Sequence, residues 1–139
     1  MGVLQNRTKL TDGNGNELLV PERGTLLITG TLKDELGVAI PLSSIGTLTL
    51  TLYAPELEGQ PIINSVSGVN VLNDGVRGVV HATNGTVTLT LLPADGAIID
   101  ATKEIELHRA LLRWTYGAGG AKGAPHEIDF SVRNLNKLS

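Results

Sequence analysis

Histidines and carboxylates are the side chains of this sequence best suited to metal binding or acid–base chemistry. The sequence has three histidines, His81, His108 and His126. His108 and His126 fall in segments that we expect to be neighbouring strands, so their rings can approach each other. A zinc site also needs a third ligand and groups that orient the rings. We therefore predict half-buried, hydrogen-bonded histidines at strand ends, and no bound metal.

Four carboxylates lie close together in the sequence: Asp95, Asp100, Glu104 and Glu106. A pair of carboxyl groups can hydrolyse a glycosidic bond. Here the four surround a predicted turn, with Lys103 and Arg109 beside them, which is typical of a solvated surface. The G-x-S-x-G motif of serine hydrolases does not occur in the sequence. These residue types predict a protein that is not an enzyme and that uses no cofactor.

Two glycine-rich segments resemble ligand-binding loops, but neither completes the motif. Residues 12–17 alternate oxygen-bearing side chains like the start of a calcium-binding loop. Glu17 replaces its required glycine, and Arg23 replaces its final glutamate. Residues 117–123 lack the G-x-x-x-x-G-K-[ST] pattern of phosphate loops. We interpret the first segment as a polar turn and the second as the tip of a hairpin.

The composition narrows the class of protein. The 139 residues carry a net charge of −3, include no cysteine and contain only 3% aromatic residues. A nucleic-acid-binding protein needs a basic patch, and carbohydrate or single-strand sites usually depend on aromatic stacking. No apolar run approaches the roughly 20 residues of a membrane helix, and residues 1–7 lack the pattern of a signal peptide. We expect assembly in the cytoplasm, without nucleic acid, membrane or small-molecule substrate as a partner.

The elements that position these residues are predicted to be strands. Residues 46–53 alternate leucine with threonine, the period of a strand with one buried face, and residues 86–92 repeat this alternation. The Asn84-Gly85 pair predicts a hairpin that joins residues 77–82 to residues 86–92. Further strands are predicted for residues 24–33, 108–116 and 125–135. The inward side chains of the two alternating strands are predicted to be Leu48, Leu50, Leu52, Val87, Leu89 and Leu91.

Two positions interrupt the regular pattern. Gly30 falls on the inward face of its strand, which indicates a bulge or a close approach of another backbone. Ile105 and Leu107 are out of phase with the apolar residues that follow them. This predicts either a bulge near residues 107–108 or a later start of that strand.

The strand spacing predicts an all-β fold, and an immunoglobulin-like β-sandwich of about seven antiparallel strands fits it best. Trp114, the only tryptophan, is predicted to anchor its core. Residues 24–139 form this predicted domain. Residues 1–23 are polar and rich in glycine and asparagine, which predicts an N-terminal arm with an optional edge strand.

Residues 32–42 (LKDELGVAIPL), which run into the alternating residues 47–53, carry a family resemblance. The order of strand, D-x-x-G turn, Pro-Leu and alternating strand resembles the small immunoglobulin-like virion proteins of tailed bacteriophages, among them the N-terminal domain of baseplate upper proteins. Later segments agree, and the resemblance covers residues 24–135. It implies a non-enzymatic structural part of a virion: head decoration, neck or tail.

The same resemblance implies that the chain is found in the virion, where its partners are other virion proteins and copies of itself. The alternative is an immunoglobulin-like binding module that presents loops to a cell-surface protein or carbohydrate. In the N-terminal arm, spaced apolar residues suit an extended segment that adds a strand to a neighbour. The predicted partner contacts are Leu4, Leu10, Leu18, Leu19, Val20 and Lys122.

Overall fold

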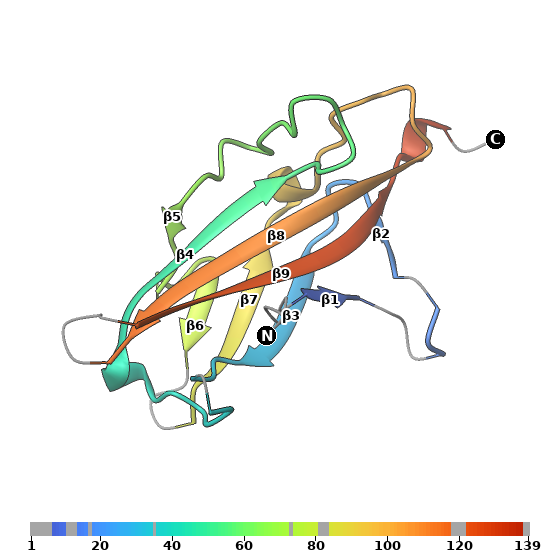
Figure 1. Cartoon of the computed structure of the whole chain (residues 1–139). Helices are drawn as coiled ribbons and strands as arrows, with labels where there is room; N and C mark the ends of the chain where they lie inside the picture. The colour runs from blue at the N-terminus through green and yellow to red at the C-terminus, as the bar shows by residue number, and fades with distance from the viewer. Residues whose placement is uncertain are drawn as a thin grey trace, which may run out of the picture.

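The computed structural model describes residues 7–10, 14–16, 18–34, 36–72, 74–80, 84–117 and 122–137, and this part of the chain is all-β (Figure 1). Its regular elements are nine strands and three 3-10 helices, with no α-helix in the described ranges. None of the helices found there is long and apolar enough to span a membrane. The strands are β1 (Arg7–Lys9), β2 (Leu19–Pro21), β3 (Leu26–Thr31), β4 (Ile45–Tyr53), β5 (Val69–Asn70), β6 (Gly78–Val80), β7 (Thr86–Leu91), β8 (Ile105–Tyr116) and β9 (Lys122–Arg133). The 3-10 helices are η1 (Leu42–Ser44), η2 (Pro93–Gly96) and η4 (Leu135–Lys137).

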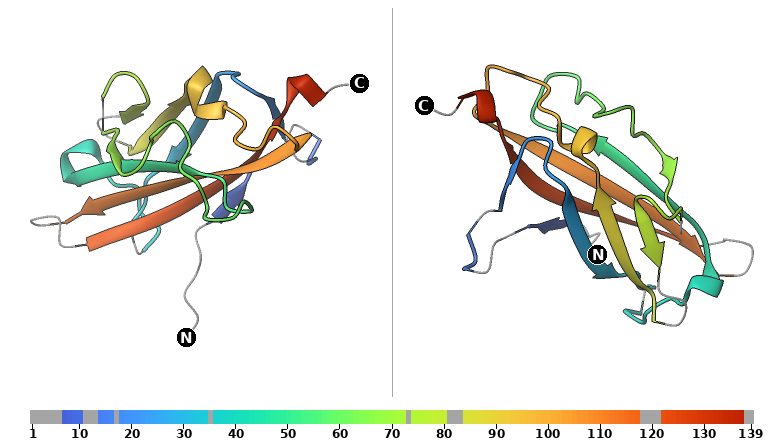
Figure 2. Two further views of the ribbon diagram at one scale, coloured as in Figure 1. Left: turned by 90° about the horizontal axis from the view of Figure 1, so that it is seen from above. Right: turned by 180° about the vertical axis from the view of Figure 1, so that it is seen from behind.

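The strands form two sheets. The larger has the order β1-β9-β8-β4-β5, with β2 also paired to β9, and the smaller has the order β3-β7-β6. The twelve-residue strands β8 and β9 form a long antiparallel hairpin that is the centre of the larger sheet. β9 begins at Lys122, inside the segment predicted as a hairpin tip. Figure 2 shows the two sheets as separate layers, with β3, β7 and β6 on one side of the long hairpin.

The N-terminal segment makes the larger sheet mixed. β1 and β2 run parallel to β9, whereas the other pairs are antiparallel. The strand count and the parallel pairs thus differ from the prediction of about seven antiparallel strands. The difference arises because a polar segment with few apolar side chains still satisfies its backbone groups along the edge of β9.

The core lies between the inner faces of the two sheets. Leu48, Leu50 and Leu52 of β4 are fully buried, and every second residue of β7 is buried opposite them. The predicted inward side chains are confirmed in both strands, since a strand places alternate residues on opposite faces. Trp114 is also buried, as predicted. Apolar side chains from both sheets belong to one continuous cluster.

β6 and β7 pair antiparallel, as predicted, although residues 81–83 lie outside the described part. A two-residue turn at Asn84-Gly85 would place residue 82 opposite Val87, so the observed register is not that of such a turn. Val80 pairs with Val87 in antiparallel register. Gly85 has a φ of +68°, and a Cβ atom at this position would lie 2.4 Å from the carbonyl oxygen of Ile40. Glycine is required here by both the backbone conformation and the close contact.

The bulge predicted near residues 107–108 is not found. β8 runs without interruption from Ile105 to Tyr116, and its pairing with β9 shows no shift of register. Its buried face continues through Glu106 and His108, which are 2% and 0% exposed. The prediction was wrong because it assumed that a buried face is apolar along its whole length.

The prediction for Gly30 was also wrong. β3 pairs with β7 in continuous register, and Gly30 lies opposite the buried Val87, so there is no bulge. A Cβ atom at Gly30 would meet no atom of the described residues within 4 Å, so no backbone in that part of the chain approaches closely either. Gly30 instead borders an open space between the two sheets.

Candidate functional site

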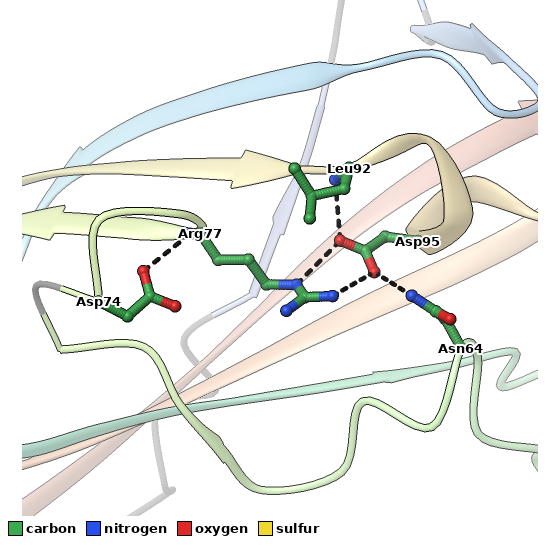
Figure 3. Close-up of polar contacts among 5 residues, drawn as sticks. All are labelled: Asn64, Asp74, Arg77, Leu92 and Asp95. Carbon is green, nitrogen blue, oxygen red and sulfur yellow. Dashed lines mark hydrogen bonds and ion pairs between the residues drawn. The ribbon is translucent and has the colours of Figure 1, made fainter.

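Three polar clusters and one apolar hollow are the organised features of the described residues. The first cluster surrounds Asp95 of η2, whose side chain is fully buried (Figure 3). The Arg77 guanidinium donates to both carboxylate oxygens at 3.0 Å, and Asn64 Nδ2 donates to Oδ1 at 2.8 Å. The backbone N–H of Leu92 donates to Oδ2 at 2.8 Å. Asp95 therefore joins three segments that are distant in the sequence.

The loop that carries Arg77 is itself fixed by a carboxylate. Asp74 Oδ1 accepts hydrogen bonds from the backbone N–H groups of Val76, Arg77 and Gly78 at 2.8–3.0 Å. Burial by itself would raise the pKa of Asp95, but the hydrogen bonds from Arg77, Asn64 and Leu92 outweigh it, and the pKa is lowered. Each oxygen of this carboxylate accepts two hydrogen bonds from the protein, which fills its acceptor positions. The cluster is suited to structural support.

The second cluster is the buried pair Glu106 and His108 on the inner face of β8. Glu106 Oε1 and Oε2 accept from the backbone N–H groups of Ile99 and Asp100 at 2.9 and 2.8 Å. His108 Nε2 lies 2.6 Å from Glu106 Oε1, and the imidazole packs edge-on against Phe130. With Nε2 as donor to the carboxylate, Nδ1 is buried without a hydrogen-bond partner among the described residues.

These two clusters correct the prediction that the carboxylates form a solvated surface. Asp95 and Glu106 are buried, each with its own set of partners, and only Asp100 and Glu104 retain exposure. Each of the two buried carboxylates is instead held by its own protein donors. His126 is half-buried, as predicted, whereas His108 is fully buried. Neither lies at the end of its strand, contrary to the prediction, and His81 lies outside the described residues.

The burial of His108 predicts a loss of stability in mild acid. Burial lowers its pKa, with the Glu106 hydrogen bond opposing the effect, so the folded protein binds this proton more weakly than the unfolded chain does. The free energy of unfolding should therefore fall as the pH drops below about 6.5, the usual histidine value. Urea denaturation at pH 7 and pH 5 measures this change in the free energy of unfolding.

His126 needs its own control in this experiment, since burial lowers its pKa as well. A His108→Gln variant keeps a donor for Glu106 but cannot titrate, and it should lose less stability between pH 7 and pH 5 than the parent protein. A His126→Gln variant measures the contribution of the second ring. Equal pH dependence in the parent and the His108→Gln variant would refute the assignment to His108.

The third cluster lies on the outer face of the larger sheet. Arg109 donates to the two carboxylate oxygens of Asp129 at 2.6 and 3.0 Å, and Glu127 lies 3.8 Å away. The guanidinium also lies 5.9 Å from the centre of the Tyr53 ring. The hydrogen bonds with Asp129 outweigh desolvation and raise the pKa of Arg109. This cross-strand network links β4, β8 and β9.

The apolar hollow lies between the two sheets at one side of the molecule. It has a volume of about 250 Å³. Ile28, Gly30 and Leu32 border it from the smaller sheet, and the opposite wall includes Trp114 of β8 and Ile128 of β9. The hollow is smaller than the roughly 300–1,000 Å³ of pockets for drug-sized ligands. It suits an apolar side chain better than a whole small molecule.

The structure also locates the residues predicted as partner contacts. Leu10 and Leu18 are half-buried against the core, Val20 belongs to the core, and Leu10 lines the hollow. Leu19 is 40% exposed on the edge strand β2. Lys122 is exposed at the start of β9, and Leu4 lies outside the described residues.

The hollow itself was not predicted. Its one signal in the sequence is Gly30, a residue without a side chain on the inward face of an otherwise apolar strand. No group of three or more histidine, cysteine or carboxylate side chains in the described ranges is placed to hold a metal ion. Comparison of the chain with family models, with curated proteins and with solved structures gives no match in any of the three.

Proposed function

We propose that this protein is a non-enzymatic structural component of a tailed-phage virion, with an immunoglobulin-like β-sandwich that acts through protein–protein contacts in a repeated assembly. The location is the head surface, the neck or the tail. Support for the virion comes from the resemblance carried by residues 32–53 and the later strands. Support for the mode of contact comes from the free edge of β3.

The free edge of β3 is the observation that carries the proposal. Among the residues that the structure describes, β3 pairs only with β7, so half of its backbone N–H and C=O groups point away from the sheet. No charged residue or proline occurs from Gly24 to Leu32, and Leu27 is 65% exposed. Soluble proteins usually protect such edges with lysine, proline, a bulge or a covering segment. An edge without this protection favours strand addition by another polypeptide.

A lysine on the β3 edge should block the contact. We expect the parent protein to self-associate in sedimentation velocity and to be present in particles purified by density gradient. A Thr29→Lys variant should stay monomeric and be absent from particles, because the lysine opposes pairing at this edge. Thr49→Lys, on the outer face of β4, which is paired on both sides, is the matched control and should behave like the parent. A monomeric parent that is absent from particles would overturn the proposed function.

A further inference from the structure

The space beside β3 has room for one added strand. β3 is the last strand of the smaller sheet, and the hollow lies between it and residues of β8, β9 and Leu10. The larger sheet continues past β9 with β1 and β2, and both figures of the whole chain show β1 beyond β3 (Figures 1 and 2). A strand paired to β3 would lie about 4.8 Å further out, above this extension. Because β1 and β2 extend the larger sheet past β9, a single extended segment suits the edge of β3 better than a whole second sheet.

Gly30 determines what the added strand must carry. Directly opposite residues of two paired strands point to the same face of a sheet. The residue opposite Gly30 would therefore point inward, where a Cβ atom at Gly30 meets none of the described atoms within 4 Å and the hollow begins. The surroundings are apolar, with Ile28, Leu32 and Trp114 among the lining residues. An aliphatic side chain is the occupant that this environment favours.

The segment that precedes β1 has the required chemistry. Residues 1–6 read Met-Gly-Val-Leu-Gln-Asn and carry no charged side chain, which matches the uncharged stretch from Gly24 to Leu32. Six extended residues span about 20 Å, the length of the six-residue strand β3. Val3 and Leu4 are adjacent, so alternation places one of them inward in either phase of pairing.

Resting on the proposed function, we infer that residues 1–6 of a second copy of this chain add a strand to the free edge of β3 and place Leu4 in the hollow beside Gly30. Main-chain hydrogen bonds with β3 would give affinity, and the fit of Leu4 would fix the register. A chain that gives its segment to one neighbour and receives a segment from another forms a head-to-tail contact. Such contacts close into rings or continue as filaments.

Filling the hollow from within should prevent this docking while the fold is retained. A Gly30→Leu variant places its own side chain in the hollow without a clash at the Cβ atom. We expect it to melt like the parent but to self-associate at least tenfold more weakly. Gly123→Leu, at another strand position where a Cβ atom makes only ordinary contact, is the matched control and should associate like the parent. Deletion of residues 2–6 should have the same effect as Gly30→Leu.

Cross-linking tests the identity of the occupant, and the absence of native cysteine makes it specific. A mixture of Leu4→Cys and Gly30→Cys chains should give a disulfide-linked dimer under mild oxidation, whereas Leu4→Cys mixed with Gly123→Cys should not. An internal disulfide in the double variant, without a dimer in the mixture, would show that the segment docks on its own chain and would overturn the inference.

The two proposals fail in different ways. If Thr29→Lys blocks association but Gly30→Leu and the deletion of residues 2–6 leave it unchanged, the edge of β3 is a contact and residues 1–6 are not its occupant. In that case the further inference is overturned and the proposed function is retained. If Thr29→Lys also leaves association unchanged, the β3 edge is not the contact, and the further inference is overturned together with the proposed mode of contact. The virion role itself is overturned by a parent that is monomeric and absent from particles.

Discussion

Leu50→Asp and Leu89→Asp should each abolish the folded state. The two leucines are 0% and 1% exposed, and they come from interior strands of different sheets. Each substitution places an unpaired carboxylate in the shared core, at a cost of several kcal/mol, which is comparable to the whole stability of a typical domain. Loss of the β-type circular dichroism spectrum, and of the blue-shifted fluorescence of the buried Trp114, would report unfolding.

The neighbouring threonines are the matched controls for these variants. Thr49 and Thr88 are one residue away and face outward from the same strands. Thr49→Asp and Thr88→Asp should leave both spectra unchanged, with a loss of about 1 kcal/mol in urea denaturation, as is usual for single substitutions. If the threonine variants unfolded as completely as the leucine variants, the assignment of inner and outer faces would be wrong.

The strands of the core could be predicted because their signal is local. In residues 46–53 and 86–92, leucine or valine alternates with threonine, and this period of two decides both the element and its buried face. The turn signal of Asn84-Gly85 is equally local, since an Asn-Gly pair favours a turn with positive φ at the glycine. No knowledge of the sheet order is required for either prediction.

The buried polar clusters could not be predicted, because their partners are distant in the sequence. Asp95 is accommodated in the interior by Arg77 and Asn64, 18 and 31 residues away. Glu106 is accommodated by backbone N–H groups of a loop that folds back onto β8. A carboxylate in a polar segment is usually exposed, and the sequence contains no sign that these donors converge.

The free edge and the hollow depend on sheet order, which is a property of the whole chain. β3 looks like any other apolar strand in the sequence, and its edge is free only because no described segment pairs on that side. Residues 1–23 were predicted as an arm with an optional edge strand, and the structure pairs β1 and β2 from this segment with β9 of the same chain. A donated segment is therefore restricted to the residues that precede β1.

The largest effect outside the apolar core is expected from Asp95→Ala. The substitution leaves the Arg77 guanidinium, Asn64 and the N–H of Leu92 without the acceptor they share in the interior (Figure 3). Removing one partner of a buried ion pair typically costs about 3–5 kcal/mol, most of it from the charge that remains. The urea concentration at the midpoint of denaturation should fall accordingly, and the variant should unfold at a clearly lower temperature than the parent.

A second aspartate separates the effect of burial from that of turn hydrogen bonding. Asp34 also accepts two backbone hydrogen bonds in a turn, from Leu36 and Val38 at 2.9 Å, but at an exposed site and without a bound arginine. Asp34→Ala should cost only about 1 kcal/mol, the net value of an ordinary exposed cap or turn contact. Similar losses of stability in Asp34→Ala and Asp95→Ala would show that the buried cluster contributes no more stability than an ordinary turn contact.

A double-mutant cycle then measures the ion pair itself. Arg77→Ala should also be strongly destabilising, since it leaves the Asp95 carboxylate buried with Asn64 and Leu92 as its remaining donors. The double variant removes both charges together, so its loss should be smaller than the sum of the two single losses by roughly 0.5–3 kcal/mol. Strict additivity of the two losses would mean that Arg77 and Asp95 stabilise the fold independently, in contradiction to the two 3.0 Å contacts that join them.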